Sequence, residues 1–367
     1  MLSDRVKRID ASGIRKVFDL AATMHDPINL SIGQPDYDVP DAVKEAGIAA
    51  IRAGFNRYTV TQGIPELHER IRQALREQKG FEPEAILITS GTSGGILLAL
   101  LATVNPGDEV IFPDPYFVMY KHLVHLCDGK CIFLDTYPDF RLRREDLEPL
   151  LTGKTKMIIL NSPCNPTGVV YTAEELRVVA DLVEGTDIIV ISDEIYESLV
   201  YCETFASMAS IRPDTLLLGG FSKAYAMTGW RLGYAAGPGA LIHQMTKLQQ
   251  YTFVCAPSFT QKAGVAALDI DVSEQMAVYR RKRDLIYAGL VDAGYEVTKP
   301  EGAFYIFPKA PWGTGMEFVE QAIRNNLLII PGGVFSERDT HFRIAYPAPD
   351  ETIERGLEVL RKIVRKA

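Results

Sequence analysis

Short runs of apolar, mostly β-branched residues recur along the first part of the chain, and stretches with helical spacing separate them. Successive positions in these runs are apolar, which is typical of parallel strands covered by helices on both faces. We therefore expect buried strands at Ala85–Thr89, Val110–Phe112, Cys131–Leu134, Met157–Leu160, Ile188–Ile191, Leu216–Leu218 and Leu232–Ala235.

The segments between these runs carry the signals of helices. Leu67, Ile71 and Leu75 share one face of a helix expected to begin near Pro65 and to end at Gly80. Thr172 with Glu175 forms a capping box at the start of another helix. This alternation predicts an α/β fold, with a mainly parallel sheet sandwiched by helices.

The pattern changes after about residue 260. Two helical segments, Thr260–Leu268 and Glu274–Leu290, precede a strand-like AFYIF at 303–307 and a closing amphipathic helix. A chain of 367 residues suggests two domains at about 150 residues each. We therefore expect a smaller α+β domain joined to the large one through a helix.

Composition narrows the class of protein. The formal charge of −8 argues against a nucleic-acid binder, which needs a basic face. The longest apolar run, Ile96–Val104, is far shorter than the roughly 20 residues that span a bilayer. The charged N-terminus does not resemble a signal peptide, and five cysteines are few for a disulfide framework. We expect a cytoplasmic protein without a metal site.

Polar residues that follow the predicted strands are the candidates for chemistry, because ligands of α/β proteins bind at the carboxyl ends of strands. A glycine-rich turn, SGTSGG, follows the first strand, and NSPCNPTG (161–168) follows the fourth. Asp193, Glu194 and Lys223 come after two later strands. Each alone has an ordinary interpretation: a tight connection, a rigid turn, a structural ion pair or a surface lysine.

Together these features hold pyridoxal phosphate in known enzymes, where a lysine forms a Schiff base and a carboxylate keeps the pyridine nitrogen protonated. The stretches NSPCNPTG, SDEIY and SKAYAMTGWRLGY occur in this order and spacing. With them, the chain resembles the fold-type I pyridoxal-phosphate aminotransferases of class I/II, the group of aspartate and aromatic aminotransferases. The resemblance extends from IGQPD at residue 32 to FRIA at residue 342.

The resemblance implies a role for each matching residue of the cofactor site. Lys223 is the Schiff-base lysine and proton shuttle, and Asp193 is the partner of the pyridine nitrogen. Tyr196 and Asn165 are the donors to the ring's phenolic oxygen. The remaining cofactor contacts are the stacking aromatic, Phe117 rather than Tyr116, and the phosphate ligands Thr92, Ser93 and Arg231.

Substrate contacts and a partner subunit are implied in the same way. Arg343 clamps the substrate α-carboxylate, next to the backbone of Gly33, and Asn165 also lies at the substrate. Tyr58 reaches the phosphate of the neighbouring subunit, which implies a homodimer with shared active sites. Many family members carry a serine where this chain has Gly220, and Ser222 is the candidate to replace it.

The predicted domain boundaries follow from the meeting of Gly33 and Arg343 at one carboxylate. Residues 1–36 form an N-terminal arm and part of the small domain, residues 37–265 the large cofactor domain, and residues 266–367 the small domain with the interdomain helix.

The predicted activity is two-step transfer of an amino group from an L-amino acid, aspartate, aromatic or similar, to a 2-oxo acid such as 2-oxoglutarate. A C–S lyase that depends on pyridoxal phosphate is the alternative, since the same site supports both reactions. The residues that choose the amino donor are not evident from the sequence; Phe18 and the segment Tyr251–Pro257 are candidates.

Overall fold

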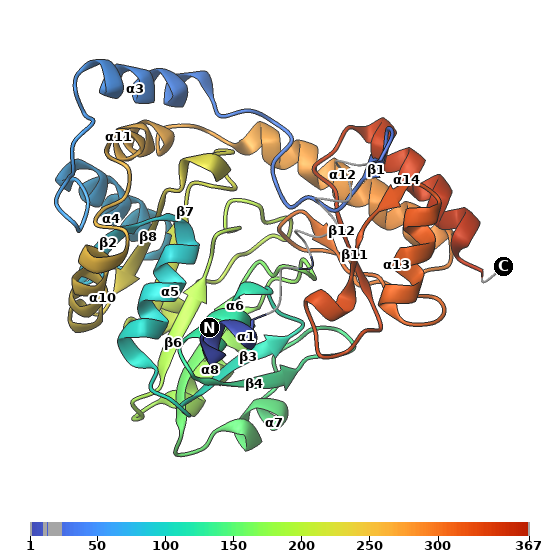
Figure 1. Ribbon diagram of the computed structural model, residues 1–367, viewed down its shortest axis with the longest axis horizontal. Helices are drawn as coiled ribbons and strands as arrows, with labels where there is room; N and C mark the ends of the chain where they lie inside the picture. Colours follow the sequence, from blue (N-terminus) through green and yellow to red (C-terminus); the bar gives the residue numbers. More distant parts are fainter. Residues whose placement is uncertain (1, 10–12, 14–23, 366–367) are drawn as a thin grey trace.

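A seven-stranded sheet forms the centre of the computed structural model, which describes residues 2–9, 13 and 24–365 (Figure 1). The strand order is β2-β8-β7-β6-β5-β3-β4. Every strand predicted for this sheet is present, with small shifts at the ends. Their bounds are β2 Ala85–Thr89, β3 Glu109–Asp114, β4 Lys130–Asp135, β5 Thr155–Asn161, β6 Ile189–Asp193, β7 Leu216–Gly220 and β8 Gly233–Gly237.

The sheet is parallel apart from one strand. β8 runs antiparallel to both of its neighbours, β2 and β7, while all other neighbouring strands are parallel. The carboxyl ends of β3, β5, β6 and β7 therefore open onto the same edge. The mainly parallel sheet expected from the apolar runs is confirmed, and the reversed strand is a feature that those runs do not encode.

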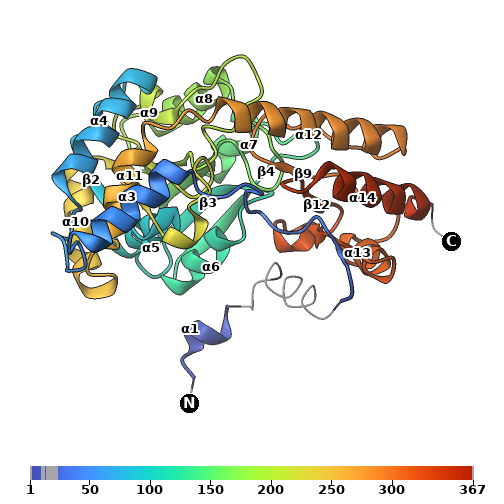
Figure 2. The ribbon, with the colours of Figure 1, turned by 90° about the horizontal axis from the view of Figure 1, so that it is seen from above.

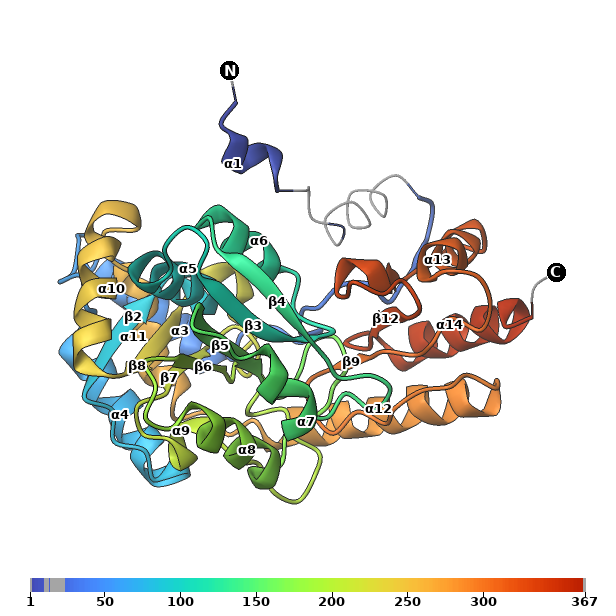
Figure 3. The same ribbon diagram turned by 90° about the horizontal axis from the view of Figure 1, so that it is seen from below.

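Helices cover both faces of this sheet, as Figure 3 shows. Alternate residues of one strand enter different cores: Leu216 and Leu218 face one side and Leu217 the other. The first face packs against α5 (Gly91–Thr103), α6 (Met119–Leu126) and α10 (Gly239–Thr252). The second packs against α4 (Pro65–Lys79), α8 (Ala173–Val183) and α11 (Ser258–Ala267), with α3 (Asp41–Arg52) lying on α11.

The helix ends follow the local signals of the sequence. Helix α4 has Pro65 in its first turn and ends at Gly80, whose positive φ of 63° suits a residue without Cβ. Thr172 and Glu175 make both hydrogen bonds of the capping box at the start of α8. The shorter helices of this part are α1 (Asp4–Lys7), α7 (Arg144–Leu147) and α9 (Met208–Ile211).

A second group of elements lies beside the large sheet (Figure 2). A three-stranded antiparallel sheet contains β11 (Ile330–Pro331), β12 (Phe342–Ala345) and β9 (Tyr305–Ile306). The helices of this group are α12 (Ser273–Asp292), α13 (Gly315–Arg324) and α14 (Asp350–Ile363).

The N-terminal segment joins this second group. β1 (Ile28–Asn29) pairs in parallel with β10 (Leu327–Leu328), although about 300 residues separate them in the sequence. The side chains of Ile28 and Leu30 enter the same core as those of α12 and α14. This pairing brings the backbone near Gly33 toward the strand that carries Arg343. The exact domain boundaries expected from the sequence stay a prediction.

Two further observations bear on the class of protein. Among residues 2–9, 13 and 24–365, no helix has the length and apolar character needed to cross a membrane. All five cysteines are free thiols.

Adjacent residues of α12 give a matched test of this second core. The Leu290 side chain is fully buried, whereas Val291 is 47% exposed. We expect Leu290→Ala to lower the free energy of unfolding by about 2–5 kcal/mol, because it leaves a cavity. Val291→Ala is expected to cost less than about 1 kcal/mol. Urea titrations of both variants measure the difference, and equal losses would contradict the packing of α12 described above.

Candidate active site

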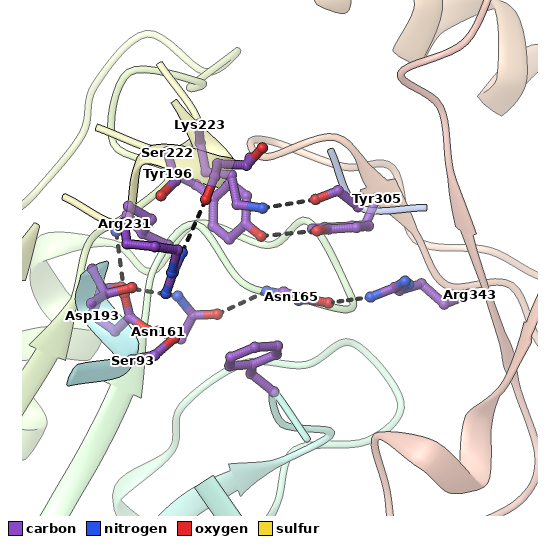
Figure 4. Close-up of a pocket in the computed structure, with 15 residues that line it drawn as sticks. Ser93, Asn161, Asn165, Asp193, Tyr196, Ser222, Lys223, Arg231, Tyr305 and Arg343 are labelled. Atoms are coloured by element: carbon purple, nitrogen blue, oxygen red, sulfur yellow. Dashed lines mark hydrogen bonds between the residues drawn. The ribbon is translucent and has the colours of Figure 1, made fainter. Parts of the chain in front are cut away.

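One cavity, of about 250 Å³, lies at the carboxyl edge of the large sheet and faces the small antiparallel sheet. Figure 4 shows that side chains from both groups of elements point into it. The lining includes every site residue predicted from the sequence except Tyr58, namely Gly33, Thr92, Ser93, Phe117, Asn165, Asp193, Tyr196, Lys223, Arg231 and Arg343. Asn161, Ile195, Ser222, Thr228 and Tyr305 complete it.

Strand pairing shapes the loop that follows β5. Asn161 at the end of β5 lies in register with Asp193 at the end of β6. The Asn161 side-chain amide donates to the backbone carbonyl of Asp193 over 2.9 Å, and its Oδ1 accepts from the backbone N–H of Asn165 over 2.9 Å. Asn165 is thereby held at the cavity by the edge of the sheet.

The two acidic residues after β6 have different surroundings. The Glu194 carboxylate, fully buried, pairs with Lys79 Nζ at 2.8 Å and accepts hydrogen bonds from Ser192 and Ser207. Asp193 lines the cavity and accepts from the Tyr120 hydroxyl over 2.7 Å. Of the two carboxylates, Glu194 is therefore a structural ion pair and Asp193 is the one available to a ligand.

The Asp193 carboxylate is buried without a cation in contact. Burial raises its pKa to about 6; the hydrogen bonds from Tyr120 and from the Ile195 backbone oppose this rise, and Glu194 adds to it. A buried carboxylate of this kind is stabilised by a cationic partner. A protonated ring nitrogen at this position would supply that partner.

Lys223 follows β7 and ends in the cavity. Its Nζ donates to the backbone carbonyl of Gly33 over 2.7 Å and lies 5.5 Å from the centre of the Tyr196 ring. Burial, and then the charges of Arg343 and Arg231, lower its pKa to about 8. A larger share of the amine is thus neutral near pH 8 than for a solvated lysine, and neutral amines attack aldehydes.

The start of α5 and Arg231 form a positively polarised pocket wall. Helix α5 begins at Gly91, and no side chain caps its free N–H groups. Thr92 and Ser93 lie in its first turn and line the cavity. Gly91 has a positive φ of 68°, a conformation that favours glycine, and a Cβ there would lie 2.8 Å from Arg231 Nη2. Backbone N–H groups at a helix start together with a guanidinium favour a phosphate.

A side chain would pack tightly at position 220, where many family members carry a serine. A Cβ on Gly220 would lie 3.0 Å from Ile195 Cδ1 and 3.3 Å from the Gly233 backbone, and Gly220 does not line the cavity. Ser222, two residues later, does line it. Of positions 220 and 222, position 222 is therefore the one from which a serine hydroxyl can reach a ligand in the cavity.

Arg343 enters the cavity from β12. The guanidinium donates to Asn165 Oδ1 over 3.1 Å and to the Ser31 backbone carbonyl over 2.8 Å. The rings of Tyr305 and Phe335 lie on it, each centre 4.5 Å from Cζ. Nε has no hydrogen-bond partner although it is buried. A planar cation with unused donors is suited to a carboxylate.

The cavity therefore fits the cofactor that the sequence leads us to expect. A phosphate site at the start of α5, the Lys223 amine and the Asp193 carboxylate surround one space, and Phe117 forms part of its wall. These are the groups that a flat pyridine ring with a phosphate arm, an aldehyde and a basic nitrogen requires. Among the described residues, no group of His, Cys, Asp or Glu side chains is arranged to hold a metal ion.

Some predicted residues lie elsewhere. Tyr58 is 83% exposed and does not line the cavity of its own chain. None of Tyr251–Pro257 lines it either, and Tyr251 is 85% exposed. Phe18 lies outside the described residues.

The sequence interpretation missed two tyrosines. Tyr120 lies one helical turn after Phe117, at the start of α6, and that spacing could have indicated a second side chain on the same side. Tyr305 belongs to the small antiparallel sheet, and no motif or periodicity marks it as different from the other aromatics of AFYIF.

Comparisons with known proteins agree with this geometry. The sequence model of the family "Aminotransferase class I and II" matches residues 25–360. A probable aspartate aminotransferase of Methanocaldococcus jannaschii is 38% identical, covering 99% of this chain and 100% of its own. An aromatic-amino-acid aminotransferase of Thermococcus litoralis is 36% identical, over 100% of this chain and 98% of its own.

A solved structure extends the likeness to three dimensions. The aspartate aminotransferase of Thermus thermophilus with maleate superposes with a TM-score of 0.96 at 33% identity, covering 99% of both chains. The match in sequence and in structure runs over nearly the whole length. The chain belongs to the class I and II aminotransferases, transferases of fold type I that depend on pyridoxal phosphate.

Proposed function

We propose that this aminotransferase moves the amino group of aspartate or an aromatic L-amino acid to a 2-oxo acid such as 2-oxoglutarate, in two half-reactions. The observation that carries the proposal is the placement of the Lys223 amine and the Arg343 guanidinium on one buried cavity. An amino acid held by its carboxylate at Arg343 presents its Cα to the side where Lys223 ends.

The cofactor site has a role for each side chain. When bound, pyridoxal phosphate supplies an electron sink for the electrons of the broken Cα–H bond. Lys223 Nζ would hold the cofactor through its aldehyde, and the same amine would move the proton from the substrate Cα. Asp193 keeps the ring nitrogen protonated. Tyr196 and Asn165 donate to the ring oxygen, and Thr92, Ser93, Ser222 and Arg231 hold the phosphate.

The orientation of the substrate follows from Arg343. Its two sandwiching rings and its hydrogen bonds to Asn165 and Ser31 leave the guanidinium little freedom. A carboxylate bound to it bidentately is fixed in direction, with Gly33 leaving space beside it. A substrate held in this way would direct its Cα–H bond toward Lys223.

The choice of amino donor rests on the relatives. Those compared above act on aspartate or on aromatic amino acids, and the Thermus enzyme binds maleate, a dicarboxylate. Ser93 lines the cavity and carries no charge to pair with a second carboxylate, which is consistent with a donor range that includes aromatic side chains.

A homodimer is part of the proposal. Exposed apolar side chains gather on segments that hydrogen bonds tie together: the segment 55–61 is bonded to α10 and α11 through Gln249, Ser258 and Gln261. The exposed members are Phe55, Tyr58, Val60, Tyr251, Phe253 and Val254. Such a patch is typical of a surface covered by a second subunit, here another copy of the chain. Tyr58 would then reach the partner's phosphate site. The proposal also places the enzyme in the cytoplasm.

A panel of amino donors tests the reaction and the clamp together. With 2-oxoglutarate as acceptor, we expect aspartate and aromatic amino acids to give glutamate, measured by coupled assay. Arg343→Ala is expected to raise KM for all donors by about tenfold to a hundredfold, because hydrogen bonds to charged groups contribute about 1.5–3 kcal/mol. An effect on KM for one donor only would place Arg343 at the substrate side chain. Release of pyruvate and ammonia from a cysteine derivative, with no 2-oxo acid acceptor present, would indicate the lyase.

The pH dependence of cofactor binding tests Lys223. The neutral amine is the reactive form, so the rate at which the cofactor-free enzyme combines with pyridoxal phosphate should rise with pH, with a midpoint at about 8. Arg343→Leu removes a cation that lowers the pKa of Lys223, and it should move the midpoint upward. Lys223→Ala should form no covalent adduct. A midpoint near that of a solvated lysine would contradict the buried environment.

Mixing two inactive variants tests the shared site. In a heterodimer of Lys223→Ala and Tyr58→Ala chains, one site carries both defects and the other carries neither, if Tyr58 acts in the partner's site. After the two chains are mixed and refolded together, the activity at limiting cofactor should therefore exceed the sum of the activities of the two separate variants. If Tyr58 acted within its own chain, each site would keep one defect, and no activity would be regained.

A further inference from the structure

Tyr305 lies between the two halves of the active site. It belongs to β9 and is 1% exposed. In the register of the small sheet it lies opposite Ala345, two residues from Arg343 on β12. Side chains directly opposite or two residues apart share a face of an antiparallel sheet, so Tyr305 and Arg343 project to the same side. The distance of 4.5 Å between the Tyr305 ring centre and Arg343 Cζ agrees.

The hydroxyl of Tyr305 contacts the cofactor half. It lies 2.9 Å from the hydroxyl of Tyr196, which follows β6, and the two rings meet edge to face at 5.7 Å. Either hydroxyl can donate in this pair. If Tyr196 donates its proton to the ring oxygen of the cofactor, as proposed above, Tyr305 is the donor to the Tyr196 oxygen; Figure 4 shows the two hydroxyls facing each other beside the cavity.

A second observation shows how little space this contact has. A Cβ on Gly33 would lie 2.1 Å from the Tyr305 hydroxyl oxygen. A residue with a Cβ at position 33 would therefore force the Tyr305 ring or the backbone at residue 33 to move. The same glycine offers its carbonyl to Lys223 Nζ at 2.7 Å. The backbone at residue 33, Tyr305 and Tyr196 are thus packed as one unit.

We propose that Tyr305 is a positioning residue with two separable roles: its hydroxyl orients the hydroxyl of Tyr196 toward the ring oxygen of the cofactor, and its ring supports Arg343. The proposal rests on the roles proposed above for Tyr196 and Arg343. Tyr305 then connects Arg343, which binds the substrate carboxylate, with Tyr196, which influences the protonation of the nitrogen between Lys223 and the cofactor.

The second role is shared with Phe335. Its ring lies on the guanidinium of Arg343 at the same distance of 4.5 Å. Phe335 has no hydroxyl and, unlike Tyr305, does not line the cavity. It is therefore a matched control for the support of Arg343 without the contact to Tyr196.

Titration of the holoenzyme's visible absorbance tests the hydroxyl. A hydrogen bond from Tyr196 to the ring oxygen of the cofactor favours the deprotonated form of the nitrogen that joins Lys223 to the cofactor. Weakening this hydrogen bond therefore raises the midpoint, the pH at which half of the sites are deprotonated. We expect Tyr305→Phe to raise it by about 0.5 to 1 unit, since one hydrogen bond changes an equilibrium about threefold to tenfold. KM for the amino donor should change less than about twofold, because the ring remains.

The ring is tested by KM. Tyr305→Leu should raise KM for all amino donors about threefold to tenfold, as expected for loss of a cation–π contact, and should also shift the midpoint. Phe335→Leu should raise KM similarly and leave the midpoint unchanged. Thermal unfolding of each holoenzyme identifies any variant whose fold is altered, and Tyr305→Phe, which keeps the packing, tests the hydroxyl alone.

The outcomes separate this proposal from the one on which it depends. If Tyr196→Phe shifts the midpoint and Tyr305→Phe does not, Tyr305 does not orient Tyr196 and its first role is wrong. If Tyr305→Leu leaves KM unchanged while Arg343→Ala raises it, the second role is wrong. If Tyr196→Phe itself leaves the midpoint unchanged, the role proposed for Tyr196 fails, and the hydroxyl role of Tyr305 fails with it.

Discussion

The dominant physical constraint on this structure is an excess of positive charge around a buried cavity in an acidic protein. Lys223, Arg231 and Arg343 line the cavity, and Asp193 is the acidic side chain among its described lining residues. Arg343 is buried and Lys223 partly buried, whereas Arg231 is exposed. Burying cations without counterions is costly, so anionic ligands stabilise the first two. A phosphate and a substrate carboxylate meet that need. The net charge of −8 says nothing about this site, because the charges that bind the ligand are local.

The arrangement of the two sheets makes this concentration of charge possible. In the large sheet, parallel pairing brings the ends of β5 and β6 to one edge, so Asn161 and Asp193 meet there, and the turn after β7 adds Lys223. The pairing of β1 with β10 then brings the N-terminal segment to the small sheet, which carries Arg343. Arg343 and the N-terminal segment, from the two ends of the chain, thus face Asn161, Asp193 and Lys223, which come from its middle.

Buried tyrosines fill the space between these charges. Burial raises the pKa of Tyr120, Tyr196 and Tyr305, which therefore stay protonated and act as neutral donors. Tyr120 donates to Asp193, while Tyr305 lies between Tyr196 and Arg343. Hydrogen bonds in a medium of low polarity are stronger than in water, so such chains of contacts transmit a change of charge from one group to the next.

The strands of the large sheet, the helices between them and most of the cavity lining could be predicted from the sequence. Apolar runs identify parallel strands because both faces of each strand must be covered, and motifs such as NSPCNPTG and SDEIY lie directly at strand ends. Features that depend on contacts between distant segments were visible only in the folded chain. They are the reversal of β8, the ion pair that occupies Glu194 and the position of Tyr305 beside Tyr196. The hydrogen bonds that give Glu194 and Tyr305 their properties come from partners 115 and 109 residues away in the sequence, and local sequence patterns carry no information about such partners.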